Sequence, residues 1–558
     1  MTVVDRLAVM LSNRREFLAL AGASAGALAG AAPPRQPNIV LILADDLGFS
    51  DIAPYGGEID TPHLTALARD GVRLRQFYNT ARCCPTRASL LTGLYSHQAG
   101  VGHMVADDGL PGYRGDLSRN AVTIAEVLKP AGYKTMMCGK WHVTPPDADS
   151  HNWPVQRGFD KYYGTIAGSA DYFNPITLTR DNTPISVDPQ KPFYYTDALG
   201  EQAAAYIHDH KRESPQSPFF LYAAFTAPHW PLHALQPEID KYADRYQGGW
   251  DKLREERHQR QLAMGLADPK WGITARDSAV PAWADSPDKE WHARRMAIYA
   301  AQVDRLDQNI GKILAALRET GLENDTLVMF MSDNGGCAEE LARTGTLPGA
   351  RRNTVDGRAV RSGNIPEVMP GREDSFQSYG VGWANASNTP FRLYKHWEHE
   401  GGISSPFIAR WPARITAKKG TFLDQTGHVA DVMATCVDIA NAKYPATFAG
   451  HDIQPAEGRS LAPALTGGRP VARELYWEHE GNRAIRVGNW KLASQFPGGW
   501  ELFDIARDRT ERHDLAARFP ARVKEMTAQW DRWAARANVV PWAEIQARRK
   551  AKPPAPPA

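Results

Sequence analysis

Four apolar segments of this chain each end in polar residues that are able to do chemistry. Continuous apolar runs of this kind are expected of strands buried on both faces of a parallel sheet. Ligands of open α/β sheets bind beyond the carboxyl ends of such strands, so the residues after the four segments are predicted to meet at one site. Asp45 and Asp46 follow residues 38–44, Lys140 and His142 follow 133–138, His229 follows 219–224, and Asp333 and Asn334 follow 326–331.

Asp45, Asp46, Asp333 and Asn334 together offer three carboxylates and one amide oxygen. Hard oxygen ligands of this kind suit Ca²⁺ or Mg²⁺. The alternative is that each pair caps a helix, because aspartate and asparagine are common at helix N-termini. The sequence therefore predicts a site for one hard divalent cation, with helix capping as the alternative.

Residues 83–93 read Cys-Cys-Pro-Thr-Arg-Ala-Ser-Leu-Leu-Thr-Gly and form the most specific motif of the chain. This motif resembles the sulfatase signature, which is Cys-x-Pro-Ser/Thr-Arg followed by four residues and Thr-Gly. In that family the cysteine is oxidised to formylglycine, so the resemblance makes Cys83 the modified residue and Cys84 the variable position. Thr86 stands where the family more often has serine. A buried cysteine pair at the start of a helix is the alternative.

The resemblance implies a nucleophile made from Cys83. A formylglycine aldehyde hydrates to a geminal diol, in which one hydroxyl attacks sulfur and the other later expels sulfate. Arg87, in the first turn of the predicted helix, would hold the diol, and the helix N-terminus suits an anionic substrate. The chain has only five cysteines, an odd number, which argues against a disulfide scaffold.

Further positions match the sulfatase pattern one by one. The segment Gly-Lys-Trp-His at 139–142 resembles a sulfatase segment in which Lys140 would contact a sulfate oxygen and His142 would assist the diol or hemiacetal. Val143 and Thr144 depart from the usual Leu-Gly that follows, which questions the shape of this loop. His229, after a proline, resembles the histidine that helps to protonate the leaving oxygen.

Lys395 completes the set that the resemblance implies. It lies shortly before the sequence Glu-Gly-Gly-Ile at 400–403 and resembles the lysine that contacts both sulfate and leaving oxygen. His396 and His399 have no such counterpart and are predicted to be structural. By family analogy the cation is Ca²⁺, with Mg²⁺ less favoured, and Cys83, as formylglycine, joins the four oxygen-bearing residues as a ligand.

The function that the resemblance implies is arylsulfatase-like hydrolysis of sulfate monoesters, yielding an alcohol or phenol and inorganic sulfate. One alternative is a related formylglycine hydrolase acting on phosphonate monoesters or phosphodiesters. Relatives of that type resemble each other in having glutamine and histidine among their metal ligands, so the aspartates here favour sulfate. The other alternative is a catalytically silent binder of sulfated glycans.

The sequence leaves the substrate open among aryl sulfates, alkyl sulfates and sulfated polysaccharides. A set of large aromatic residues could wall a pocket for a ring, since aromatic side chains stack on either a phenyl or a sugar ring. The same residues could equally be packing residues. They are Trp250, Trp271, Trp283, Trp291, Tyr172 and Phe173.

The elements that must position these residues alternate between strands and helices, which predicts a largely parallel sheet covered by helices on both faces. A helix is predicted over 62–70, a capping box at Thr123 and Glu126 opens another, and a helical stripe covers 296–317. From about residue 470, short alternating stretches and a closing helix over 520–537 predict a small antiparallel sheet with one helix. The resemblance implies an alkaline-phosphatase-like fold.

The predicted domains are a catalytic domain over 32–469, a small α+β domain over 470–545 and a disordered Pro-rich tail over 546–558. Two polar insertions, 233–290 and 339–390, are long enough to be functional. The formal net charge of +2 indicates no nucleic-acid partner.

Residues 1–31 are expected to be a twin-arginine signal peptide. They contain Arg14 and Arg15, an apolar run and a small-residue cleavage pattern that ends at Ala31. An uncleaved anchor is the alternative. This segment predicts the twin-arginine translocase as a partner, a periplasmic or secreted location, and action of a formylglycine-generating enzyme before export.

Overall fold

The computed structural model describes residues 36–147, 149–343 and 347–551. At its centre five strands run parallel in the order β8–β1–β7–β3–β4. β1 (Asn38–Ala44), β7 (Phe219–Ala224) and β8 (Thr326–Ser332) are buried at every residue, as their continuous apolar sequences predict. β3 spans Lys134–Gly139 and β4 spans Lys161–Thr165. The four segments that carry the predicted site residues are therefore neighbours in one sheet.

Further strands extend this sheet to eleven strands among the described residues. On the β8 side, β12 (Phe407–Arg410) is antiparallel to both β8 and β2 (Val72–Tyr78). β13 (Phe422–His428) runs parallel to β2, and β11 (Ser404–Ser405) is antiparallel to it. On the other side β5 (Leu178–Arg180) and β6 (Thr183–Pro184) continue antiparallel from β4. The sheet is thus mixed, with a parallel centre.

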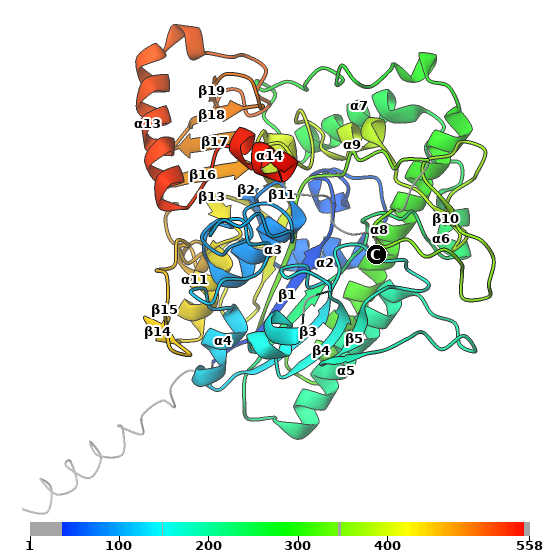
Figure 1. Ribbon diagram of the computed structural model, residues 1–558, viewed down its shortest axis with the longest axis vertical. Coiled ribbons are helices and arrows are strands. Elements are labelled where there is room, and N and C mark those ends of the chain that lie inside the picture. The colour runs from blue at the N-terminus through cyan, green and yellow to red at the C-terminus, as the bar shows by residue number, and fades with distance from the viewer. Residues whose placement is uncertain (1–35, 148, 344–346, 552–558) are drawn as a thin grey trace, which may run out of the picture. The chain divides into compact units, whose positions relative to one another are not determined.

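Helices cover both faces of the sheet. Alternate side chains of β1 therefore enter two separate cores. Val40 and Ile42 pack with the helices of one face, while Leu41 and Leu43 pack with those of the other. The first face holds α2 (Pro62–Asp70), α5 (Tyr195–Glu213), α6 (Gln236–Tyr242), α7 (Gly249–Ala263), α8 (Lys289–Glu319) and α9 (Val381–Ser387). The second holds α3 (Cys83–Thr92), α4 (Ile124–Leu128), α11 (Asp431–Ile439) and α12 (Ala462–Leu465) (Figure 1). The predicted fold class is confirmed.

A second sheet of four antiparallel strands forms near the C-terminus, drawn in orange in Figure 1 beside α13. Its strands are β16 (Glu474–His479), β17 (Asn482–Val487), β18 (Trp490–Ser494) and β19 (Glu501–Asp504). Met526, Trp530 and Trp533 of α13 (Pro520–Arg536) pack on Ile485 and Leu492 of this sheet. The boundary at 469/470 stays a prediction.

Residues 546–551 are helical, whereas the sequence led us to expect them in a disordered tail. They belong to α14 (Trp542–Ala551), which is anchored by the buried Ile545 and by an ion pair between Arg549 and Asp108. These two contacts explain why the helix is ordered in spite of the prolines that follow it. The rest of the predicted tail, 552–558, and the predicted signal peptide, 1–31, lie outside the described residues.

The remaining described elements are short. They include α10 (Glu400–Ile403) and two small sheets, β9 (Arg361–Ser362) with β10 (Ser375–Phe376) and β14 (Thr447–Phe448) with β15 (His451–Asp452). None of the helices in the described part of the chain combines the length and apolar character needed to cross a membrane.

Candidate active site

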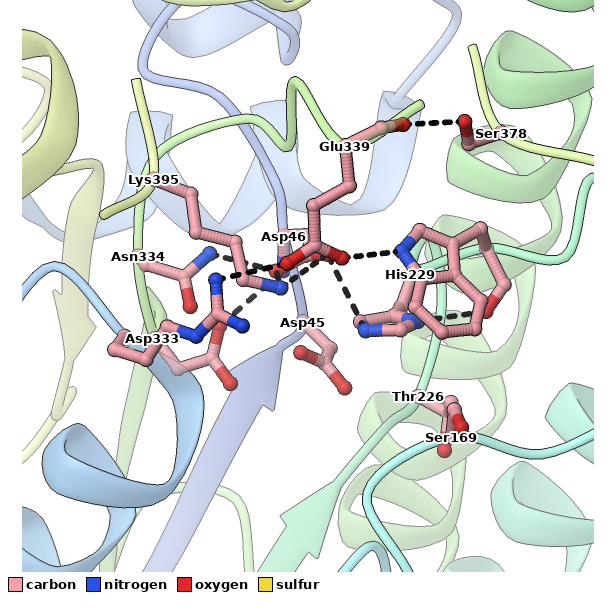
Figure 2. A network of polar contacts seen from close by, with 12 residues as sticks. Asp45, Asp46, Ser169, Thr226, His229, Asp333, Asn334, Glu339, Ser378 and Lys395 are labelled. Atoms are coloured by element: carbon pink, nitrogen blue, oxygen red, sulfur yellow. Dashed lines mark hydrogen bonds and ion pairs between the residues drawn. The ribbon is translucent and has the colours of Figure 1, made fainter. Parts of the chain in front are cut away.

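The carboxyl ends of the central strands bring the predicted site residues together. Asp46 lies at the centre of a polar network, with Asn334, Lys395 and His229 pointing toward it (Figure 2). The remaining predicted residues join through Asp45, Asp333 and the N-terminus of α3. All ten predicted residues lie in this network or line the pocket above it: Asp45, Asp46, Cys83, Arg87, Lys140, His142, His229, Asp333, Asn334 and Lys395.

Two oxygens at this site have no hydrogen-bond donor among the described residues. They are Oδ1 of Asp45 and Oδ1 of Asn334, and both are fully buried. Buried polar atoms are nearly always paired in folded proteins, so two unpaired acceptors on adjacent strands indicate a missing electropositive partner. A hard cation bound by oxygens fits this donor set. Neither pair acts as a helix cap in the structure, since β1 and β8 lead into turns and loops.

Arg87 and Lys140 neutralise the carboxylates from the side of α3 and β3. Arg87 donates to Oδ2 of Asp333 at 2.9 and 3.2 Å and to the carbonyl of Lys140 at 2.9 Å. Lys140 lies 2.5 Å from Oδ2 of Asp45. Burial raises the pKa of Asp45, but Lys140 and further basic neighbours outweigh burial and bring it to about 2.

Asp333 behaves differently from Asp45. Burial and the nearby Asp45 raise its pKa well above the ordinary value, against the opposing effect of Arg87. Two carboxylates so close together compete for the same positive charge. Arg87 therefore offsets only part of the rise in pKa that burial and Asp45 cause.

Cys83 opens α3, and its side chain faces the pocket. Its exposed fraction is 2%. The adjacent Cys84 side chain favours the thiolate form of Cys83, and Lys140, His142 and Lys395 add to this effect. The pKa of the Cys83 thiol therefore lies well below its ordinary value, although burial opposes the shift. The same burial raises the pKa of Cys84, so the two adjacent cysteines differ sharply in acidity.

His142 is held against the Cys83 side of the pocket in an unusual backbone conformation, with φ of +52°. A Cβ on Gly168 would lie 2.2 Å from the imidazole, so only glycine permits this close approach. Burial lowers the pKa of His142 to about 4, which leaves the ring neutral at pH 7. Its Nδ1 has no partner in the described part of the chain, so a nitrogen is available to a substrate or proton.

His229 and Lys395 approach Asp46 from the opposite side. Nδ1 of His229 lies 2.6 Å from the carbonyl of Trp230, and Nε2 lies 3.4 Å from Asp46. Tyr172 fixes this loop by donating to the carbonyl of His229 at 2.8 Å. Lys395 lies 2.9 Å from Asp46, and that carboxylate raises the pKa of the lysine well above its ordinary value in spite of burial.

Glu339 is a site residue that the sequence did not single out. It accepts from the indole N–H of Trp230 at 2.9 Å and pairs with Arg82 at 2.8 Å. Burial raises its pKa, but Lys395 and Arg82 lower it well below the ordinary value. In the sequence, only its position at the start of the polar insertion 339–390 could have indicated a functional role for Glu339.

A pocket of about 650 Å³ opens above these residues. Cys83, His142, His229 and Lys395 line its floor together with Glu339. Its walls are mostly apolar and come from Met104, Val105, Pro146, Ala167, Ile176, Trp230, Leu341, Leu347 and Pro348.

The aromatic residues that could have walled a pocket do not line the one at this site. Trp250 lies edge-on to Trp283 at 4.7 Å and to Trp383 at 5.4 Å, away from this pocket. Trp291 carries Arg295 over its ring at 4.1 Å, and Trp271 is buried. Tyr172 and Phe173 lie next to His233 and Tyr194 rather than on the pocket wall.

A family model described as Sulfatase matches residues 37–442. This fold and this site therefore place the chain in the sulfatase family, and it is a sulfuric ester hydrolase. An uncharacterized sulfatase of Schizosaccharomyces pombe is 35% identical over 547 residues, which cover 91% of this chain and 95% of the relative. An arylsulfatase of Klebsiella aerogenes is 33% identical over 467 residues, covering 80% of this chain and 96% of the relative.

Solved structures share the fold at lower identity. The crystal structure of Ps i-CgsB superposes with a TM-score of 0.66 at 24% identity, covering 93% of this chain and 98% of the other. BT4656 in complex with its substrate D-glucosamine-2-N,6-O-disulfate gives a TM-score of 0.59 at 19% identity, covering 90% and 98%.

Proposed function

We propose that this protein is an arylsulfatase-like enzyme that hydrolyses sulfate monoesters with a formylglycine hydrate derived from Cys83. The observation that carries the proposal is the position of Cys83. Its side chain lies at the floor of the pocket, at the N-terminus of α3, among the basic residues Arg87, Lys140 and Lys395. A helix N-terminus and three cations suit a dianionic or monoanionic oxyester head group.

The hydrated aldehyde would supply one hydroxyl for attack on sulfur and a second for release of sulfate. Arg87 is held by Asp333 and by a backbone carbonyl, so its guanidinium is fixed beside residue 83. Lys140 and Lys395 are buried and would neutralise sulfate oxygens as negative charge develops. His142 is neutral at pH 7 and would take a proton at its free nitrogen.

His229 and Lys395 would share the protonation of the leaving oxygen. Both side chains line the pocket and both lie on the same carboxylate, that of Asp46. Proton donors held this close to the leaving oxygen remove the cost of expelling an alkoxide or phenoxide. The contact from Tyr172 to the carbonyl of His229 keeps this donor in position.

The cation that we propose is Ca²⁺. Asp45, Asp46, Asp333 and Asn334 would hold it, with residue 83 completing the set, because their oxygens are hard and buried and two of them have no donor in the described part of the chain. A bound Ca²⁺ would withdraw charge from the sulfate oxygens. The side chains of Lys140 and Lys395 contact the carboxylates of Asp45 and Asp46, so their charges lie beside the oxygens that would hold the cation.

The pocket favours an aromatic or otherwise apolar leaving group over a multiply sulfated glycan. Its walls are largely apolar, and two carboxylates in its lining, those of Glu339 and Glu340, would repel further sulfate groups. The nearby Arg82 and Arg295 are already paired with these glutamates, at 2.8 and 3.0 Å. The arylsulfatase name of the Klebsiella aerogenes relative agrees with this choice.

The proposed setting is the periplasm or the extracellular space, after twin-arginine export and after modification by a formylglycine-generating enzyme. The support is the Arg14–Arg15 pattern followed by an apolar run.

The mass of the tryptic peptide Cys83–Arg87, from protein purified out of its natural host, tests the nucleophile. We expect the thiol sulfur of Cys83 to be replaced by an aldehyde oxygen or its hydrate, with Cys84 unchanged. An intact Cys83 in every molecule would remove the proposed nucleophile and favour a silent binder of sulfated glycans.

Turnover of matched aryl esters tests the reaction. Cys83→Ala should abolish hydrolysis of an aryl sulfate without unfolding the protein, whereas Cys84→Ala, the matched control, should retain it. Near-normal turnover by Cys83→Ala would refute the mechanism. An aryl phosphonate hydrolysed faster than the aryl sulfate would make the protein a phosphonate hydrolase instead.

A further inference from the structure

A second cluster of metal-ligating side chains lies where the C-terminal sheet meets the loop after α3. His103 comes from that loop, His479 ends β16, and Glu480 forms the turn between β16 and β17. Each offers one ligand atom, and these three atoms lie within 4.8 Å of one another. His396, which follows the active-site residue Lys395, adds a third imidazole beside them.

His479 is a buried histidine whose hydrogen-bonding capacity is not used by the described residues. Its side chain is 0% exposed, and neither ring nitrogen has a hydrogen-bond partner in the described part of the chain. The ring stacks on that of His103, with centroids 5.5 Å apart and planes inclined by 8°. A neutral imidazole always carries one lone pair, and a buried nitrogen without a partner is costly. A bound cation would use that lone pair.

Glu480 supplies a carboxylate next to this free nitrogen. One of its oxygens contacts Nε2 of His103 and lies 4.0 Å from Nε2 of His479. The other oxygen lies 3.0 Å from Nδ1 of His396. The residue adopts φ of +52°, a strained conformation for a non-glycine residue at a hairpin turn. The strained turn thus points a charged group at three histidines, His103, His396 and His479.

The arginines near this cluster are ion-paired with other carboxylates, and Arg549 in addition contacts the ring of His103. Arg82 lies 2.8 Å from Glu339, and Arg549 lies 2.7 Å from Asp108. Their charges are therefore balanced locally, which leaves the carboxylate of Glu480 to serve the histidines. This balance removes an electrostatic objection to placing a further cation in the cluster.

We propose that His103, His479 and Glu480 bind a divalent transition-metal ion, Zn²⁺, at a site separate from the oxygen-ligand site of the active centre. Two imidazoles and one carboxylate form a three-ligand set that zinc commonly takes, with water in the fourth position. Ligands at about 2.1 Å in a tetrahedron lie about 3.4 Å apart, so closing the 4.0 Å gap requires a side-chain adjustment of under about 1 Å. His396 orients the carboxylate through its other oxygen.

Binding requires a change of tautomer at His103. Nη2 of Arg549 lies 2.9 Å from Nδ1 of His103 and donates to it, so the neutral ring carries its proton on Nε2. For Nε2 to bind the metal, that proton moves to Nδ1, and Arg549 gives up this contact. Arg549 keeps Asp108 through its Nε at 2.8 Å and its Nη2 at 2.7 Å. Arg549→Gln should therefore bind zinc more tightly than the parent protein.

The ion would join the C-terminal hairpin to a wall of the active-site pocket. Met104 and Val105, which follow His103 directly, line that pocket. Zinc held by His103 and by His479 of β16 would thus fix the apolar wall in place. This role does not depend on the nucleophile proposed for Cys83.

Zinc affinity measured by competition with a chromophoric chelator tests the site. All proteins carry Cys83→Ala and are kept in excess Ca²⁺, which removes the thiol and fills the oxygen-ligand site. We expect one tightly bound Zn²⁺ per chain, and a loss of affinity of at least about 100-fold in His479→Gln and in Glu480→Gln. The matched control is His97→Gln, which breaks another buried histidine–glutamate contact, 2.8 Å to Glu478 of β16.

Three outcomes would overturn the proposal. The first is a parent protein that binds no more zinc than His479→Gln. The second is an equal loss of zinc affinity in His97→Gln. The third is loss of binding in Arg549→Gln, which would contradict the role of His103. Should His479→Gln fail to fold, Glu480→Gln decides, because Glu480 is partly exposed and its replacement leaves the core intact.

Discussion

We expect Arg87→Met to lower the free energy of unfolding strongly. Among single substitutions of similar side-chain length at the active site, it should have the largest effect. The guanidinium is fully buried and donates to Asp333 and to the carbonyl of Lys140. Methionine fills much of the same volume and makes none of these bonds. Asp333 would then be left as a buried carboxylate without its arginine.

Removing one partner of a buried ion pair costs about 3–5 kcal/mol, because the other charge stays buried and unpaired. We expect Arg87→Met to lose about this much free energy of unfolding, measured by urea denaturation at pH 8 in the presence of a calcium chelator. The loss should shrink as the pH is lowered. Burial already raises the pKa of Asp333, and without Arg87 the group would protonate more readily and so lose its charge.

Arg157→Met is the matched control. Arg157 is also buried and is held by Glu126 at 3.0 Å and by Asn152 at 2.8 Å, remote from the pocket. Arg157→Met should lose a comparable free energy of unfolding and keep its affinity for calcium. Arg87→Met should lose that free energy of unfolding and, in addition, its turnover. A loss below about 1 kcal/mol for Arg87→Met, or one independent of pH, would refute the assigned role of Arg87 as partner of a charged Asp333.

Three further predictions follow from the same contacts. Removal of calcium by a chelator should abolish hydrolysis of an aryl sulfate and Ca²⁺ should restore it, whereas full turnover in chelator would contradict the proposed cation. Burial raises the pKa of Asp307 to about 7, so the folded state holds this proton more tightly than the unfolded chain and stability falls as pH rises from 3.8 to about 7. Asp307→Asn should flatten that part of the thermal-stability profile, and an unchanged slope would contradict it. Tyr172→Phe removes the hydroxyl that donates to the carbonyl of His229, and it should lower kcat about 10-fold with little change in unfolding temperature; an unchanged kcat would count against this positioning role.

The central strands and the predicted site residues were accessible from sequence because burial on both faces leaves a simple pattern. β1, β7 and β8 are continuous apolar runs, and each is followed at once by site residues. A parallel sheet then brings those residues to one edge without any further information. The motif at 83–93 pointed to Cys83 and Arg87 as site residues because it resembles the sulfatase signature.

Other parts of the site depend on contacts that no local pattern encodes. Glu339 reaches the pocket because Arg82 and Trp230, which are far away in sequence, hold its carboxylate. β2 breaks its alternation of buried and half-exposed residues at Gln76, and β12 is only four residues long, so neither gave a clear signal. Trp250 and Trp283 of the 233–290 insertion pack against each other, and sequence alone does not distinguish a packed indole from one that lines a pocket.

The burial of Cys83 would set the order of events in the maturation that we propose. With its side chain 2% exposed at the base of the pocket, the residue is accessible to small molecules but not to the active site of another enzyme. Any enzyme that oxidises this thiol must therefore act while the segment 83–93 is still unfolded. A chain that folds before it meets that enzyme would be correctly folded and permanently inactive. The fraction of active molecules would then depend on a competition between two rates, that of modification and that of folding.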